Sequence, residues 1–153
     1  MFKGSLVALA TPFDSNNRVD YTSLKGLIEF HISAGTDGLV IAGTTGEAAT
    51  MNRDEHTELV ARSVEFVDGR LPVIAGTGSN STRQTINMSR CVAETGVDAF
   101  LVVVPYYNKP MQQGMFEHFT AIADAVPRPV LMYNVPGRTV ADMQAETVAR
   151  LAQ

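Results

Sequence analysis

The segment 43–47, Gly-Thr-Thr-Gly-Glu, places two adjacent hydroxyls, Thr44 and Thr45, between glycines. Glycine lets the backbone turn sharply and come close to a ligand. Threonine amides and hydroxyls can donate hydrogen bonds to an anion or pass a proton. A plain glycine-rich turn is the alternative, but the residue types favour a loop that binds an anion or moves a proton.

Two further segments carry phenol and guanidinium groups. Tyr106 and Tyr107 are adjacent between prolines, and on an extended segment one ring faces a site while the other faces elsewhere, such as a partner surface. Tyr133 is followed by a Pro-Gly turn and Arg138, whose guanidinium offers a bidentate fork for a carboxylate. Ordinary surface aromatics and a surface ion pair are the alternatives. These residues predict a site for a small carboxylate.

Each of these segments follows a short apolar run that is predicted to be a strand. Such runs recur about every 30 residues, at 6–10, 38–42, 72–75, 99–104 and 130–133. Helical patterns separate them, and this alternation predicts βαβ units and a parallel sheet. In α/β proteins of this kind the ligand binds at the carboxyl ends of the strands, which is where the three segments lie.

The helical patterns carry their own start and stop signals. Helices are predicted after Asp20, at 53–67 behind an Asn52/Glu55 capping box, before Gly96, around Phe116, Phe119, Ile122 and Ala123, and from near Asp142. Five βα units match a doubly wound sheet in number, whereas a closed (β/α)8 barrel requires eight, about 250 residues. Periodicity alone leaves both architectures open.

Composition restricts the class of protein and of partner. The chain has 153 residues, 45% of them apolar and 18% charged, which excludes disorder. The formal net charge is −4 without long charged runs, so neither nucleic acid nor an anionic membrane is an expected partner. No apolar stretch approaches the roughly 20 residues of a membrane span. The lone Cys91 cannot form an internal disulfide and is predicted to be a small buried hydrophobe in a reducing cytoplasm.

No pattern of ligands for a metal or a dinucleotide is convincing. His31, His56 and His118 are predicted to lie on three different helices, so no metal site is expected. The segment 76–81 resembles a dinucleotide fingerprint weakly, because Ser81 occupies the third glycine position.

Four motifs in this order resemble one family, bacterial dihydrodipicolinate synthase (4-hydroxy-tetrahydrodipicolinate synthase). They are GTTGE at 43–47, PVIAGTGSN at 72–80, PYYNKP at 105–110 and YNVPGRT at 133–139. The resemblance covers the whole chain and a little over the first half of a family member. It implies a (β/α)8 TIM barrel, of which residues 1–153 would supply about the first five βα units as the N-terminal part of a single domain.

The resemblance also implies a class I aldolase-type reaction in lysine and diaminopimelate biosynthesis. A lysine would form an imine with pyruvate, and the derived enamine would attack L-aspartate 4-semialdehyde. Tyr133 would be the general acid and base, linked through Thr44 to Tyr107 of the partner subunit. Thr44 and Thr45 would hold the pyruvate carboxylate, and Arg138 the carboxylate of the aldehyde. A cytoplasmic homotetramer, a dimer of dimers, without a separate cofactor is expected.

The imine-forming lysine of the family lies at the end of a sixth strand, so we expect it to be missing from residues 1–153. Lys3, Lys25 and Lys109 are poor substitutes because none sits among the apolar walls that lower an amine pKa. The chain alone is therefore expected to be inactive. The alternatives are a related lyase (N-acetylneuraminate lyase or a keto-deoxy sugar acid aldolase), which usually lacks the turn carrying Arg138, and a non-catalytic half-barrel assembly module.

The family's lysine-feedback site is matched only in part. Ala49, His56, Asn80 and Tyr106 match positions that contact the inhibitor, whereas Ala48, Arg53 and Gln84 do not match the polar and acidic residues found there. A cation at 53 and a neutral side chain at 84 disfavour the ε-ammonium group of lysine. We predict weak or absent inhibition of the full-length enzyme in a lysine titration, and strong inhibition would contradict this.

Overall fold

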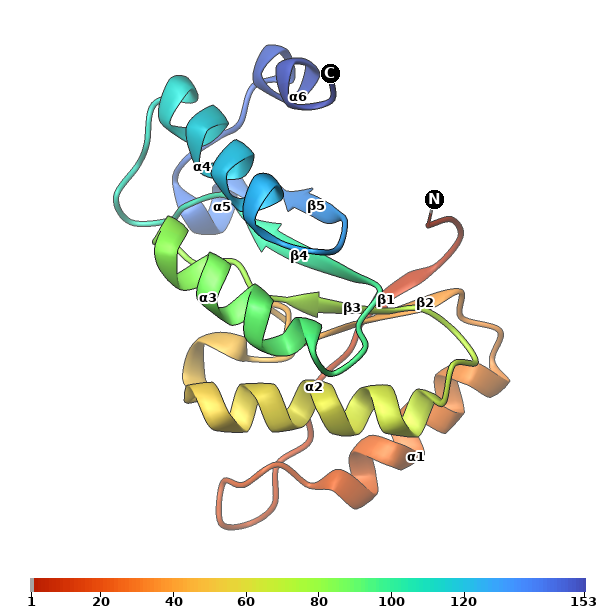
Figure 1. Cartoon of the computed structure of the whole chain (residues 1–153). Coiled ribbons are helices and arrows are strands. Elements are labelled where there is room, and N and C mark those ends of the chain that lie inside the picture. The colour runs from red at the N-terminus through yellow and green to blue at the C-terminus, as the bar shows by residue number, and fades with distance from the viewer. Residues whose placement is uncertain (1) are drawn as a thin grey trace.

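The computed structural model describes residues 2–153 and contains a five-stranded parallel sheet with its strands in sequence order (Figure 1). The strands are β1 (Leu6–Ala8), β2 (Gly38–Ile41), β3 (Val73–Gly76), β4 (Ala99–Val103) and β5 (Val130–Tyr133). All four neighbouring pairs are parallel. Consecutive parallel strands joined by outer helices form a half-barrel.

The helices connect the strands and cover the outer side of the sheet (Figure 1). They are α1 (Tyr21–Ser33), the 3-10 turn η1 (Ala48–Thr50), α2 (Arg53–Val67), α3 (Thr82–Ala93), α4 (Gln112–Ala125), the short α5 (Pro136–Thr139) and α6 (Ala145–Leu151). Polar caps fix where three of them begin. Asp20 accepts from Thr22 N and Ser23 N, and Asn52 accepts from Glu55 N at 3.0 Å. Ser81 accepts from Gln84 N at 3.4 Å. In residues 2–153 no helix is both long enough and apolar enough to cross a membrane.

Alternate residues of the strands serve two different apolar clusters, as the pleat of a strand requires. Leu39, Ile41, Phe100 and Val102 belong to the main core under the helices. Residues on the other face form a smaller cluster. Its buried members are Val40, Ile74 and Ala99, and the partly buried residues packed against them are Phe2, Leu6, Leu101 and Leu131. A sheet that is apolar on both faces is typical of a barrel wall.

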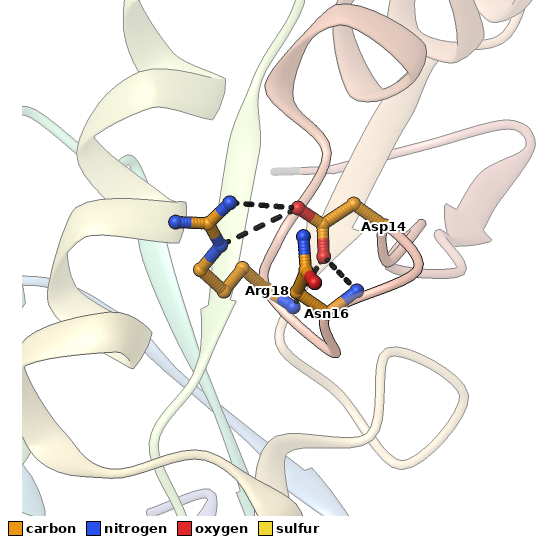
Figure 2. Close-up of polar contacts among 3 residues, drawn as sticks. All are labelled: Asp14, Asn16 and Arg18. Atoms are coloured by element: carbon orange, nitrogen blue, oxygen red, sulfur yellow. Dashed lines mark hydrogen bonds and ion pairs between the residues drawn. The ribbon is translucent and has the colours of Figure 1, made fainter.

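The chain after β1 makes a tight polar turn before it enters α1. The Asp14 carboxylate accepts from Asn16 N at 2.8 Å and Arg18 N at 2.9 Å, and it pairs with the Arg18 guanidinium at 3.3 Å (Figure 2). These bonds, the one from Arg18 N foremost, lower the pKa of Asp14. An isolated antiparallel β-bridge between Phe13 and Val19 closes the turn. The turn therefore fixes the exit from β1 and the approach to the Asp20 cap.

The predicted strands are confirmed with small shifts at their ends, and the helix at 53–67 is confirmed at both ends. Two expectations are wrong. The last helix begins at Ala145 rather than near Asp142, because the residues before it are hydrogen-bonded to Asn134 at the start of the same connection between β5 and α6. Cys91 is only partly buried, and its thiol lies 3.6 Å from the Thr57 hydroxyl between α2 and α3.

Glycine at position 76 is a steric requirement that mutation can test. A Cβ atom there would collide with the backbone carbonyl of Ala42, which cannot move without distorting the end of β2. We expect Gly76→Ala to lower the free energy of unfolding by roughly 1–3 kcal/mol. Urea unfolding followed by circular dichroism measures this change.

Gly26, on the exposed face of α1, is the matched control, because a Cβ there would meet no atom within 4 Å. Gly26→Ala should stabilise the chain by about 0.5–1 kcal/mol. Equal stabilities for the two variants would show that the close approach at Gly76 is not a constraint.

Candidate functional site

A cavity of about 660 Å³ opens at the carboxyl ends of β2 to β5. Its lining comes from the loops after these four strands and from the facing turns of α2 and α3. The residues are Ala42–Thr44, Glu47–Ala49, Met51, Arg53, His56, Gly76–Ser79, Gln84, Asn87, Met88, Leu101, Val103, Tyr106, Tyr133, Val135, Arg138 and Thr139. This volume is in the range of small-molecule sites.

The loop after β2 brings Thr44 to the cavity and not the Thr45 side chain, which is exposed outside the lining. Two residues in left-handed backbone conformations bound this loop, Ala42 at φ 52° and Glu47 at φ 59°. Thr11, a buried residue after β1, donates its hydroxyl to Gly46 O at 2.7 Å. Sequence reasoning missed Thr11, although a threonine between an apolar strand and a proline was the available signal.

The tyrosines occupy three different environments. Tyr133 ends β5, is partly buried and lines the cavity, and its carbonyl accepts from Val104 N at 2.9 Å. Tyr106 also lines the cavity, whereas Tyr107 is 89% exposed and lies outside the lining. The premise of an extended tyrosine segment is wrong, because Tyr107 has φ 72°. The left-handed backbone places that ring on the surface.

Arg138 reaches the cavity from α5, the short helical turn after β5. Arg138 N donates to Val135 O at 2.9 Å, and Val140, at φ 55°, ends the turn. Tyr133 at the end of β5, Arg138 on α5 and Thr44 in the loop after β2 thus line one cavity. Such a set can bind a carboxylate through charge-assisted hydrogen bonds and can exchange protons with a bound substrate.

The lining of the cavity also includes Ala49, Arg53, His56, Gln84 and Tyr106. Asn80 lies outside this lining, and its carbonyl accepts from Asn108 Nδ2 at 3.0 Å. The structure therefore brings together three of the four residues assigned to the feedback site. The Arg53 guanidinium also interacts with the Cys91 thiol and lowers its pKa.

The described residues, 2–153, hold no group of three histidine, cysteine, aspartate or glutamate side chains that could bind a metal ion. His31, His56 and His118 lie on α1, α2 and α4, as the sequence predicted.

Parallel strands in sequence order, outer helices and a polar cavity at the carboxyl ends of the strands define part of a (β/α)8-barrel protein. The sequence pattern of the dihydrodipicolinate synthetase family matches residues 1–153, and the chain belongs to this family.

Known relatives agree with this assignment. The chain is 60% identical to the 4-hydroxy-tetrahydrodipicolinate synthase of Pseudoalteromonas atlantica, over 99% of this chain and 52% of that protein. It is 54% identical to the synthase of Thioalkalivibrio sulfidiphilus, over 100% of this chain and 52% of that protein. The chloride-inhibited dihydrodipicolinate synthase of Acinetobacter baumannii, solved with pyruvate, is 46% identical and superposes with a TM-score of 0.98 over 100% of this chain and 53% of that one. The chain spans about half the length of the curated relatives it matches.

Two buried histidines predict a loss of stability in mild acid. His56 and His118 are each 6% exposed, their Nε2 atoms have no hydrogen-bond partner among residues 2–153, and burial lowers the pKa of both. The unfolded chain therefore binds protons more readily near the ordinary histidine pKa of about 6.5. The folded state, in which both histidines are neutral, is most stable above about pH 6.5. This stability is lost as the pH falls through that value towards the lower pKa values of the two histidines in the folded state.

We expect the urea midpoint to fall between about pH 7.5 and 5.5. The double variant His56→Gln/His118→Gln should show a flatter pH dependence, whatever its absolute stability. His31→Gln, at a partly exposed position on α1, is the matched control and should keep the wild-type slope. If the double variant kept the wild-type dependence of the urea midpoint on pH, this dependence could not be assigned to His56 and His118.

Proposed function

We propose that this chain forms the N-terminal half of a pyruvate-dependent lyase that condenses pyruvate with L-aspartate 4-semialdehyde to give 4-hydroxy-tetrahydrodipicolinate. The observation that carries the proposal is the meeting of Thr44, Tyr133 and Arg138 at one cavity, from the ends of two strands and a short helix. The names of the relatives support it, as does the pyruvate complex of the Acinetobacter baumannii enzyme. The name of the relatives' product supports a role in lysine and diaminopimelate biosynthesis, and the proposed location is the cytoplasm.

Tyr133 is the proposed general acid and base. A free phenol titrates near pH 10, so it needs hydrogen-bonding partners to exchange protons usefully at neutral pH. Thr44, in the same cavity lining, supplies one hydroxyl, and Tyr107 of the partner subunit supplies the next. The 89% exposure of Tyr107 on its own chain supports a role on a neighbouring copy, within the proposed homotetramer.

Two groups bind the carboxylates of the two substrates. Thr44, which lines the cavity, and the adjacent Thr45 hold the pyruvate carboxylate. Arg138 binds the carboxylate of the aldehyde, since a guanidinium fork matches a carboxylate in two parallel hydrogen bonds. The arginine also favours the synthase over N-acetylneuraminate lyase and keto-deoxy sugar acid aldolases, which usually lack the Pro-Gly-Arg turn.

The imine amine comes from outside residues 1–153. None of Lys3, Lys25 and Lys109 lines the cavity, and Lys25 lies over the Phe66 ring on the outer surface at 5.7 Å. The residues of this chain bind, orient and protonate the reactants, and the amine supplies the covalent step.

A second candidate function, a non-catalytic assembly module, is favoured by the unpaired outer edges of β1 and β5. Exposed strand edges recruit further strands. In this alternative the half-barrel binds another subunit and performs no chemistry of its own.

Borohydride trapping with pyruvate, measured by intact mass, separates these functions. The two samples are this chain alone and a chimera in which it replaces the matching half of the Pseudoalteromonas atlantica synthase. We expect a pyruvate adduct and condensation activity only in the chimera. Lys109→Arg, a change outside the cavity lining, is the matched control and should not alter trapping.

An adduct on this chain alone would show that one of its three lysines forms the imine. A folded chimera that gives neither adduct nor product would overturn the proposed lyase function and leave the assembly module.

A further inference from the structure

Arg138 sits on an element that cannot hold its own shape. α5 is four residues long, and a single helical turn is unstable in isolation because nucleation costs more than one turn of hydrogen bonds returns. Arg138 itself is exposed at the cavity. The position of the turn, and with it the position of Arg138, must therefore be fixed by contacts outside the turn.

One side chain closes the loop that carries Arg138. Asn134 Nδ2 donates to Asp142 Oδ1 at 2.7 Å and to Met143 O at 3.4 Å. Asn134 Oδ1 accepts from Met143 N at 3.1 Å. A single amide thus ties the two ends of the segment 134–143 together, with Arg138 near its middle.

A second side chain anchors the closed loop to α4. Gln112 Nε2 donates to Asp142 O at 2.7 Å, and Gln112 Oε1 accepts from Gln144 N at 3.1 Å and from the Thr147 hydroxyl at 2.6 Å. The carboxyl-terminal end of segment 134–143 is therefore fixed to α4, a long helix that packs on α6.

We propose that Asn134 is a positioning residue for Arg138 and thereby sets selectivity for a carboxylate on the second substrate. This inference rests on the function proposed above. Asn134 follows Tyr133 directly, so the same amide also fixes the arginine loop relative to the acid and base. A bidentate guanidinium–carboxylate pair depends strongly on direction, and a displacement of about 1 Å can cost up to a hundredfold in rate.

The chemistry of the clamp requires an amide at position 134. Asn134 donates and accepts at once, whereas an aspartate could not donate and would face the Asp142 carboxylate. An asparagine at 142 would still offer an oxygen to Asn134. The clamp therefore predicts that Asn134→Asp is harmful and Asp142→Asn is tolerated.

Steady-state kinetics of the chimera described above test the inference. We expect Asn134→Ala and Asn134→Asp to raise KM for L-aspartate 4-semialdehyde on the order of tenfold. KM for pyruvate and the rate of imine trapping should stay unchanged, and Asp142→Asn should behave like wild type. A merely structural role would impair both substrates together. Asn16→Ala is the matched control, because Asn16 contributes only its backbone N–H to an exposed turn far from the arginine loop in sequence.

Hydrogen exchange on the chain itself provides a second measurement. Asn134→Ala should speed exchange of the amides of Arg138, Thr139 and Val140, which donate to Val135 O and Pro136 O. An active wild-type chimera whose Asn134 variants keep the wild-type KM for the aldehyde would overturn the positioning role and leave the lyase function intact. An inactive wild-type chimera would overturn the lyase function and this inference with it.

Discussion

The carboxyl ends of β2, β3 and β4 approach one another so closely that a Cβ atom at Gly76 or Gly78 would collide with neighbouring backbone. At Gly76 the obstacle is the carbonyl of Ala42, and at Gly78 it is the backbone of Val102 and Val103. Because the strands are held this close, the loops that follow them converge on one cavity instead of spreading over the sheet. The positions of the loops after β2 and β3 depend on this contact between backbones.

Side-chain hydrogen bonds then hold the loops that regular secondary structure does not reach. Thr11 fixes the loop after β2 through Gly46 O, and Asn134 fixes the loop after β5 through Met143. In the loop after β3, the buried hydroxyl of Thr77 lies 2.7 Å from the buried hydroxyl of Ser89 on α3. A buried donor or acceptor left without a partner is costly, so the buried bonds of Thr11 and of Thr77 with Ser89 each select one loop conformation, while Asn134 acts through three hydrogen bonds of a more exposed amide.

Strands and long helices were predictable from sequence because their signals are local. The apolar runs gave all five strands, and Asn52 gave the first residue of α2 through its own side chain. The start of α6 and the backbone at Tyr107 were not predictable. The first depends on the bond between Asn134 and Met143, nine residues apart, and the second on a left-handed conformation that tyrosine rarely adopts. Within the site, the strand ends predicted Thr44, Tyr133 and Arg138. Thr11 was missed because it bonds to Gly46, 35 residues away, and a single long-range bond leaves no periodic pattern in the sequence.

The charged side chains around the cavity favour an anionic ligand. Among the described residues 2–153, Arg53, Arg138 and Glu47 line the cavity, so positive side chains outnumber the negative one. Burial favours the neutral form of His56, which limits its contribution to that field. Lys3, Lys25 and Lys109 lie outside the lining. Because a barrel recruits catalytic groups from the ends of separate strands, the fold is compatible with the proposed division, in which these five strands bind the substrates and transfer protons and another strand supplies the amine.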